Sequence, residues 1–247
     1  MQKSSPPVST ATNSPVLSTA GLHTAVHALD PQVAVFDCDG TLWSGDAGSG
    51  FMRWTIEHGL LSSAAIDQLD LRYKGYLAGQ VSEADICGEM VQIYHGLRDS
   101  EMRAAAAEFF AQRIERNIFP EMRALVHSLQ ARGTEIWAVS STCDWVIEEG
   151  VRRFDISPTR VLAARVAIAN DRVTRTLIDV PTDEAKVASL ARVGVTQPDA
   201  AFGNSIHDAA MLGIARRAFP VNPTAALLAR AAAQSWPVFY PASVAPA

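Results

Sequence analysis

The sequence has 247 residues, 48% of them hydrophobic and 19% charged, which is typical of a globular protein long enough to bury a sizeable core. Its net charge of -5 and the lack of a lysine- and arginine-rich stripe argue against nucleic acid as a partner. No run approaches the roughly 18 apolar residues needed to cross a bilayer, and three cysteines without metal-ligand spacing favour a reducing compartment, so we expect a cytoplasmic protein without membrane or zinc contacts.

The N-terminal part of the chain is polar. Residues 1–30 are rich in Ser, Thr and Pro, lack the unbroken apolar run of a signal peptide, and predict a flexible tail. Ordered structure is expected to begin at 33–36, where the apolar run VAVF ends in Asp37 and the turn-forming pair Asp39-Gly40. This pattern is typical of a buried parallel strand.

The segment 50–117 has apolar residues at helical spacing, as in Ile66, Leu69 and Tyr73, with glycines between the periodic stretches. It predicts a small helical bundle inserted as a cap.

After Pro120 the pattern changes to alternating helices and strands. The elements expected are a helix over 122–130, a strand over 134–139, a helix from Asp144, a hairpin turning at Asn170-Asp171, a helix over 183–193, a strand over 200–203, a helix from Ile206, a strand over 218–221 and a helix over 224–234. Together they predict an α/β fold with a doubly wound parallel sheet, whose catalytic core comprises 31–49 and 118–247.

Polar residues stand where several of these elements end or begin. They are Asp37 and Asp39, Ser140, Lys186, and Asn204 with Asp208. Ligands of open parallel sheets bind beyond the carboxyl ends of the strands, so these side chains are expected to meet. Carboxylate, carbonyl and amide oxygens are the hard ligands that Mg²⁺ prefers, and Lys186 would supply a second cation.

Each residue also has an ordinary structural explanation. Taken alone, Asp39-Gly40 could be a turn, Ser140 a loop hydroxyl or helix cap, and Lys186 a solvated lysine. Ser205 with Asp208 also matches a capping box, which is compatible with a metal role. The order of the four sites along the chain favours a common active site.

Four segments carry these residues: FDCDGTLW at 36–43, WAVSS at 137–141, DEAK at 183–186 and FGNSIHD at 202–208. In this order they resemble the four motifs of the haloacid dehalogenase superfamily, and the helical insertion lies where a C1-type cap belongs. Among the members of this superfamily, the chain most resembles phosphoserine-phosphatase-like enzymes. The resemblance implies a Mg²⁺-dependent phosphatase acting on a small phosphomonoester through an aspartyl-phosphate intermediate. The implied roles are Asp37 as nucleophile, Asp39 as general acid and base, Lys186 as catalytic cation, Thr41, Ser140, Ser141 and Lys186 as phosphate ligands, and Asp37, Asp39, Asn204 and Asp208 as the Mg²⁺ site.

The sequence departs from the family pattern at two places. Gly203-Asn204 stands where Gly-Asp is usual, so the amide should bind Mg²⁺ more weakly or Asp208 should contribute more. Asp46 stands where these enzymes have an acid that contacts the substrate amine, but the cap stretch ICGEMV lacks the arginine that pairs with the substrate carboxylate.

Several alternatives follow from these departures. Trp43, Phe51 and Trp54 with Asp46 could line a site for phosphocholine or phosphoethanolamine, although a packing seam between cap and core is favoured. A phosphotransferase or a catalytically attenuated binding protein would keep the same core, whereas a dehalogenase would not need Asp39. His207 is expected to face solvent.

Overall fold

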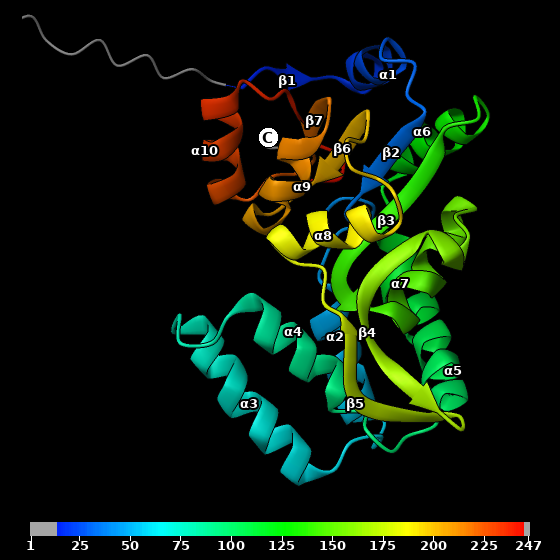
Figure 1. Cartoon of the computed structure of the whole chain (residues 1–247), viewed down its shortest axis with the longest axis vertical. Helices are drawn as coiled ribbons and strands as arrows, with labels where there is room; N and C mark the ends of the chain where they lie inside the picture. The colour runs from blue at the N-terminus through cyan, green and yellow to red at the C-terminus, as the bar shows by residue number, and fades with distance from the viewer. Residues whose placement is uncertain (1–13, 245–247) are drawn as a thin grey trace, which may run out of the picture.

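The computed structural model describes residues 14–244. Its centre is a six-stranded sheet in the order β5-β4-β3-β2-β6-β7, parallel except for the edge strand β5 (Figure 1). The strands are β2 (Val33–Phe36), β3 (Glu135–Cys143), β4 (Val161–Ala169), β5 (Arg172–Asp179), β6 (Ala200–Gly203) and β7 (Arg217–Pro220). The predicted parallel α/β sheet is therefore confirmed.

Both faces of this sheet are covered by helices. Successive strand residues point to opposite faces, so Phe36 packs in one apolar cluster and Val35 in the other. The first face is covered by α1 (Thr19–His27), α6 (Pro120–Gln130) and α7 (Asp144–Val151), and the second by α8 (Glu184–Arg192), α9 (Ala209–Ile214) and α10 (Ala225–Gln234). The fold is doubly wound, as the alternating pattern predicted.

The prediction of a flexible tail over 1–30 is wrong for residues 14–30, and residues 1–13 lie outside the described residues. Strand β1 (Val16–Leu17) pairs with β8 (Val238–Phe239), and α1 follows with Ser18 as its N-cap. Leu22 and Val26, one helical turn apart, are completely buried in the core. Apolar side chains at this spacing dock the short helix, and Leu17, Ala25 and Leu29 pack beside them. Most of the Ser, Thr and Pro residues on which the prediction rested lie before residue 16.

The insertion between β2 and α6 is helical, as expected. It contains α2 (Ala47–Glu57), α3 (Ser63–Leu77), α4 (Glu83–Gln92) and α5 (Asp99–Phe109), then a π-helical turn (Phe110–Ile114) and a 3₁₀ turn (Glu115–Asn117). Helices α2 and α5 add Phe51 and Phe109 to the main core, whereas α3 buries only Leu69. The division at 50 and 117 into a separate cap domain stays a prediction.

The hairpin of β4 and β5 turns at Asn170 and Asp171, where it was predicted. Both residues have positive φ, 50° and 58°, as a two-residue hairpin turn requires. The Gln92 side chain donates to the Arg175 carbonyl at 2.7 Å and ties α4 to this hairpin. None of the helices within 14–244 is long and apolar enough to cross a bilayer.

Candidate active site

A buried lysine joins the parts of the site that come from different elements. Lys186 on α8 donates to Asp37 Oδ1 at 2.8 Å, to Asp208 Oδ1 at 2.5 Å and to the Val139 carbonyl at 3.0 Å. Only 2% of Lys186 is exposed. Three partners match the three donors of an ammonium group, so its position is fixed without help from solvent.

The predicted nucleophile Asp37 follows the last residue of β2. Thr41 Oγ1 donates to its second oxygen at 2.9 Å. Burial raises the pKa of Asp37 to about 6, with Asp208 adding to the increase and Lys186 opposing it. Burial by itself would lower the pKa of Lys186, but the carboxylates of Asp208 and Asp37 raise it, so the lysine keeps its charge. At neutral pH the site therefore contains a charged carboxylate held by a cation.

The second aspartate, Asp39, is oriented by three donors. Trp43 Nε1 and the Ala47 amide bind Oδ1 at 2.6 and 2.9 Å, and Thr142 Oγ1 binds Oδ2 at 2.8 Å. Burial, followed by the negative charge of Asp46, raises the pKa of Asp39 to about 7. A carboxyl group with this pKa can both hold and release a proton near neutrality, as a general acid and base must. The roles of Trp43 and Thr142 were not recognised in the sequence, because each depends on a contact across the fold or a turn.

The predicted phosphate ligands divide into two groups. Ser140 and Ser141 line the cavity above Asp37, at a point where the register between β3 and β4 shifts. Thr41 is completely buried, and the described cavity lining does not include it. Its hydroxyl orients Asp37 instead.

Asp208 and Asn204 are also distinguished by their surroundings. Asp208 is completely buried, and its Oδ2 accepts the amides of Asn204 and Ser205 at 2.9 Å each, completing the capping box expected from the sequence. Its other oxygen accepts from Lys186. Asn204 lines the cavity, and its side chain lies against Gly40. A Cβ added to Gly40 would stand 2.0 Å from Nδ2 of the Asn204 side chain. Of the two, Asn204 is the one that lines the cavity.

The residues present fit Mg²⁺. The Asp37 carboxylate, the Asp39 carbonyl and the Asn204 amide supply hard oxygen ligands, and Gly40, with φ of 74°, allows Asn204 to approach the turn that contains Asp39. Within 14–244 no group of three or more His, Cys, Asp or Glu side chains could hold a metal ion. A metal here would therefore need the Asp39 carbonyl and the Asn204 side-chain amide as ligands in addition to the Asp37 carboxylate.

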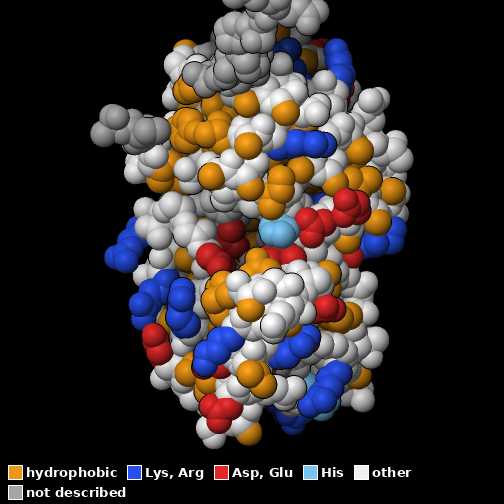
Figure 2. All heavy atoms as spheres, turned by 90° about the vertical axis from the view of Figure 1, so that its left-hand side faces the viewer, with side chains coloured by type: hydrophobic (Ala, Val, Ile, Leu, Met, Phe, Trp, Pro, Cys, Tyr) orange, Lys and Arg blue, Asp and Glu red, His pale blue; other side chains and the backbone are white. Residues whose placement is uncertain are grey.

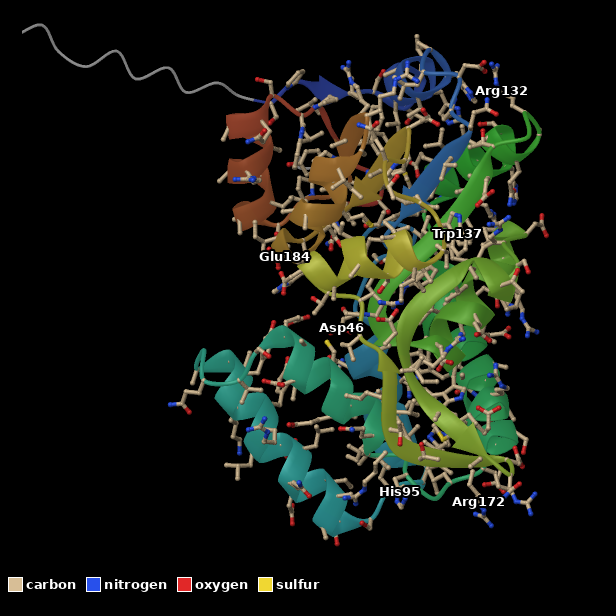
Figure 3. All side chains as sticks on the ribbon, in the orientation of Figure 1. Asp46, His95, Arg132, Trp137, Arg172 and Glu184 are labelled. Atoms are coloured by element: carbon tan, nitrogen blue, oxygen red, sulfur yellow. The ribbon has the colours of Figure 1, made fainter. Side chains whose placement is uncertain are left out.

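These residues form the floor of a cavity of about 320 Å³ whose other walls come from α2, α3 and α4. Figure 2 shows this side of the molecule hollowed at mid-height, with acidic side chains and a histidine around the hollow. Asp46 lies between α8 and α4 and lines the cavity (Figure 3). Its carboxylate caps α2 by accepting the Ser49 amide and hydroxyl at 2.9 and 2.6 Å. Lys186 is the one lysine or arginine among the described residues that line the cavity.

The family model of the haloacid dehalogenase-like hydrolases matches residues 34–213 of the sequence, which are most of the chain and include all four motif segments. The chain belongs to this family. The hydrolase is also 28% identical over 218 residues to the histidinol-phosphatase of Neisseria meningitidis serogroup C (strain 8013), covering 83% of this chain and 97% of that protein.

Two solved structures place the hydrolase by its fold. A protein of unknown function from Bordetella pertussis Tohama I has a TM-score of 0.73 at 21% identity, over 84% of this chain and 97% of its own. A phospho-aspartyl intermediate analogue of phosphoserine phosphatase has a TM-score of 0.57 at 15% identity, over 85% of this chain and 93% of its own. At these identities the likeness is one of fold.

Trp43 and Trp54 of the hydrolase belong to the favoured packing seam and do not line the cavity. Trp43 packs edge-on against Phe110 at 5.2 Å, and Trp54 packs against Phe51 and Phe109, while Phe51 also reaches the cavity.

The expectation that His207 faces solvent is wrong. His207 lines the cavity, and its Nδ1 lies 2.9 Å from Asp183 Oδ1. The sequence does not show this contact, because it joins two segments of the core that are 24 residues apart.

Proposed function

We propose that this hydrolase is a Mg²⁺-dependent phosphatase that acts on a small phosphomonoester through a covalent aspartyl phosphate. The observation that carries the proposal is the arrangement at the cavity floor. Asp37 is held by Lys186, and Asp39, whose pKa is near 7, is held separately by Trp43 and Thr142.

In the proposed reaction an oxygen of Asp37 attacks the phosphorus atom, and the bond between phosphorus and the ester oxygen breaks. Asp39 gives its proton to the departing alkoxide. Asp39 then takes a proton from a water molecule that attacks the aspartyl phosphate, which releases inorganic phosphate and restores both carboxyl groups. Ser140 and Ser141 would hold the phosphoryl oxygens throughout, and the charge of Lys186 beside Asp37 would offset part of the negative charge of the phosphate.

Asp37, the Asp39 carbonyl and Asn204 would hold Mg²⁺. Asp208 holds the backbone of Asn204 and Ser205 and the Lys186 side chain in place beside that position. When bound, the ion supplies positive charge that offsets the repulsion between the carboxylate and the phosphate dianion.

The proposed substrate class is an aminoalkyl phosphate. Asp46 supplies a negative charge near Asp39, where an ammonium group close to the ester could bind. Histidinol phosphate, phosphoserine and phosphoethanolamine share such a group. The described lining residues contain no arginine, and Lys186 is fully engaged at the phosphate end. This favours histidinol phosphate and phosphoethanolamine over phosphoserine, whose carboxylate would lack a partner.

Phosphate release from the three esters, measured with Mg²⁺ and with a chelator, tests the proposal. We expect Mg²⁺-dependent release and, after rapid acid quenching, a phosphoryl adduct on the peptide that contains Asp37. Absence of the adduct under turnover conditions would exclude the covalent route. Transfer of the phosphoryl group to an added alcohol in place of water would identify a phosphotransferase.

A further inference from the structure

The roof of the cavity contains a carboxylate that the proposed reaction does not use. Glu83 is the first residue of α4, on the cap, and lines the same cavity as Asp37 and Lys186. Its Oε1 accepts a hydrogen bond from the Cys87 thiol at 3.6 Å, whereas its Oε2 is buried and has no hydrogen-bond partner. A carboxylate oxygen that is shielded from water and has no partner is unfavourable unless a ligand supplies the missing hydrogen bond or ion pair.

The surroundings of Glu83 indicate what kind of ligand group would pair with its free oxygen. A carboxylate accepts hydrogen bonds, so the missing partner of Oε2 is an N–H or O–H donor or a cation. Tyr73 and Tyr76 line the same cavity, and their aromatic surfaces suit a flat ring. The Tyr76 hydroxyl also interacts with Glu83, and burial together with this interaction raises the pKa of Tyr76. A negatively charged end of a ligand would find no lysine or arginine at this end of the described lining.

The neighbouring histidine does not satisfy Glu83. His207 Nε2 is 3.7 Å from Glu83 Oε2, beyond hydrogen-bonding distance. The other ring nitrogen of His207 lies 2.9 Å from Asp183, so the core holds this ring independently of the cap. His207 therefore forms a second wall of the subsite, and the space at Glu83 is left for a ligand.

We infer that Glu83 is a specificity-determining residue, which binds a nitrogen-bearing ring of the substrate. This inference rests on the proposed function, since it requires the phosphate to lie at Asp37. Asp46 at the N-cap of α2 and Glu83 on α4 give the cavity lining two acidic side chains besides Asp37 and Asp39, matching an amine and a ring N–H on the same substrate. Aminoalkyl phosphates with a carboxylate in place of the ring are disfavoured at both positions.

The test compares kcat/KM for histidinol phosphate, which has an imidazole ring, with kcat/KM for phosphoethanolamine, which has none. In Glu83→Gln we expect this ratio to fall about tenfold, mainly through KM, because a charge-assisted hydrogen bond is replaced by a neutral one. Glu89→Gln is the matched control: Glu89 lies on the same helix but pairs with Arg72 outside this cavity, so the ratio should equal that of the wild type. His207→Asn should lower the ratio less than Glu83→Gln does.

An unchanged ratio in Glu83→Gln would overturn the inference, as would a wild type that prefers phosphoethanolamine. An equal fall in His207→Asn would also overturn it, since Glu83 would then act only by supporting the histidine. Calorimetric binding of both esters to Asp37→Asn separates the two proposals. If that protein binds histidinol phosphate more tightly through Glu83 while the wild type hydrolyses neither ester, the subsite is supported and the phosphatase proposal fails.

Discussion

The floor and the roof of the cavity are built in different ways. On the floor, Lys186 and Asp208 are almost completely buried, and every charged atom of the pair has a protein partner within 3.0 Å. On the roof, α3 buries only Leu69, and an oxygen of Glu83 has no partner. A floor already arranged for charge needs little reorganisation during reaction, while a roof with unsatisfied groups can select the ligand that satisfies them.

Removal of the nucleophile should produce the largest effect on the floor. Asp37→Asn should lower kcat by roughly 10⁴-fold or more, because an amide is far too weak a nucleophile. The fold should persist, since Lys186 keeps Asp208 and the Val139 carbonyl as partners. Steady-state kinetics and circular dichroism measure the two expectations. Substantial turnover of every ester tested would contradict the covalent mechanism.

Removal of the buried cation tests how far the floor depends on charge pairing. Lys186→Met leaves Asp37 and Asp208 buried together without their cation, and should lower the free energy of unfolding by about 3–5 kcal/mol. Lys74→Met on the exposed roof is the matched control and should stay within about 0.5 kcal/mol of the wild type. Urea unfolding measures both. Similar values for the two variants would mean that the buried cluster does not stabilise the floor.

The proton on Asp39 should give the floor a characteristic pH dependence. A general acid must be protonated, so kcat for an alkyl phosphate should decline as pH rises through about 7, the pKa to which burial raises this carboxyl. Asp39→Asn should abolish that decline and lower kcat roughly 10²–10³-fold. p-Nitrophenyl phosphate, whose leaving group hardly needs a proton, is the control substrate. Equal losses on both esters would exclude Asp39 as the general acid.

A smaller, favourable change is expected at Asn204. Asn204→Asp adds a negative charge at the proposed metal position and should reduce the Mg²⁺ concentration for half-maximal activity severalfold. KM for the ester should rise, because the added charge repels phosphate, so metal and ester are titrated separately. Asn170→Asp, in the distant hairpin turn, should change neither value. If Asn204→Asp leaves metal dependence untouched, Asn204 is not a ligand.

The smallest effect is expected on the outer surface of the roof. Leu71 is 71% exposed and Leu69 is 5% exposed, although both lie on α3. Leu71→Ala should change the free energy of unfolding by less than about 0.5 kcal/mol, whereas Leu69→Ala should cost about 2–5 kcal/mol. Thermal unfolding compares them. A large loss from Leu71→Ala would show that the outer face of α3 contributes to stability.

The sequence by itself determined the sheet and which polar residues stand at the ends of its strands. An apolar run that ends in Asp37 and Asp39, and the short strand that ends before Asn204, are local signals, because burial on both faces of a parallel sheet requires unbroken apolar strands. The hairpin turn at Asn170-Asp171 was equally local, since few residues other than glycine, asparagine and aspartate adopt positive φ easily.

Only the tertiary structure decided how these residues are used. Asp208 matched both a capping box and a metal ligand, and the approach of Lys186 from another helix occupied its remaining oxygen. The docking of α1 depended on Leu22 and Val26 at helical spacing, which the average composition of residues 1–30 does not show. Glu83 has no sequence signal at all, because its place in the lining of this cavity is set by how α4 packs against the core. Strand ends follow local rules, whereas contacts between a cap and a core depend on long-range packing that no short pattern encodes.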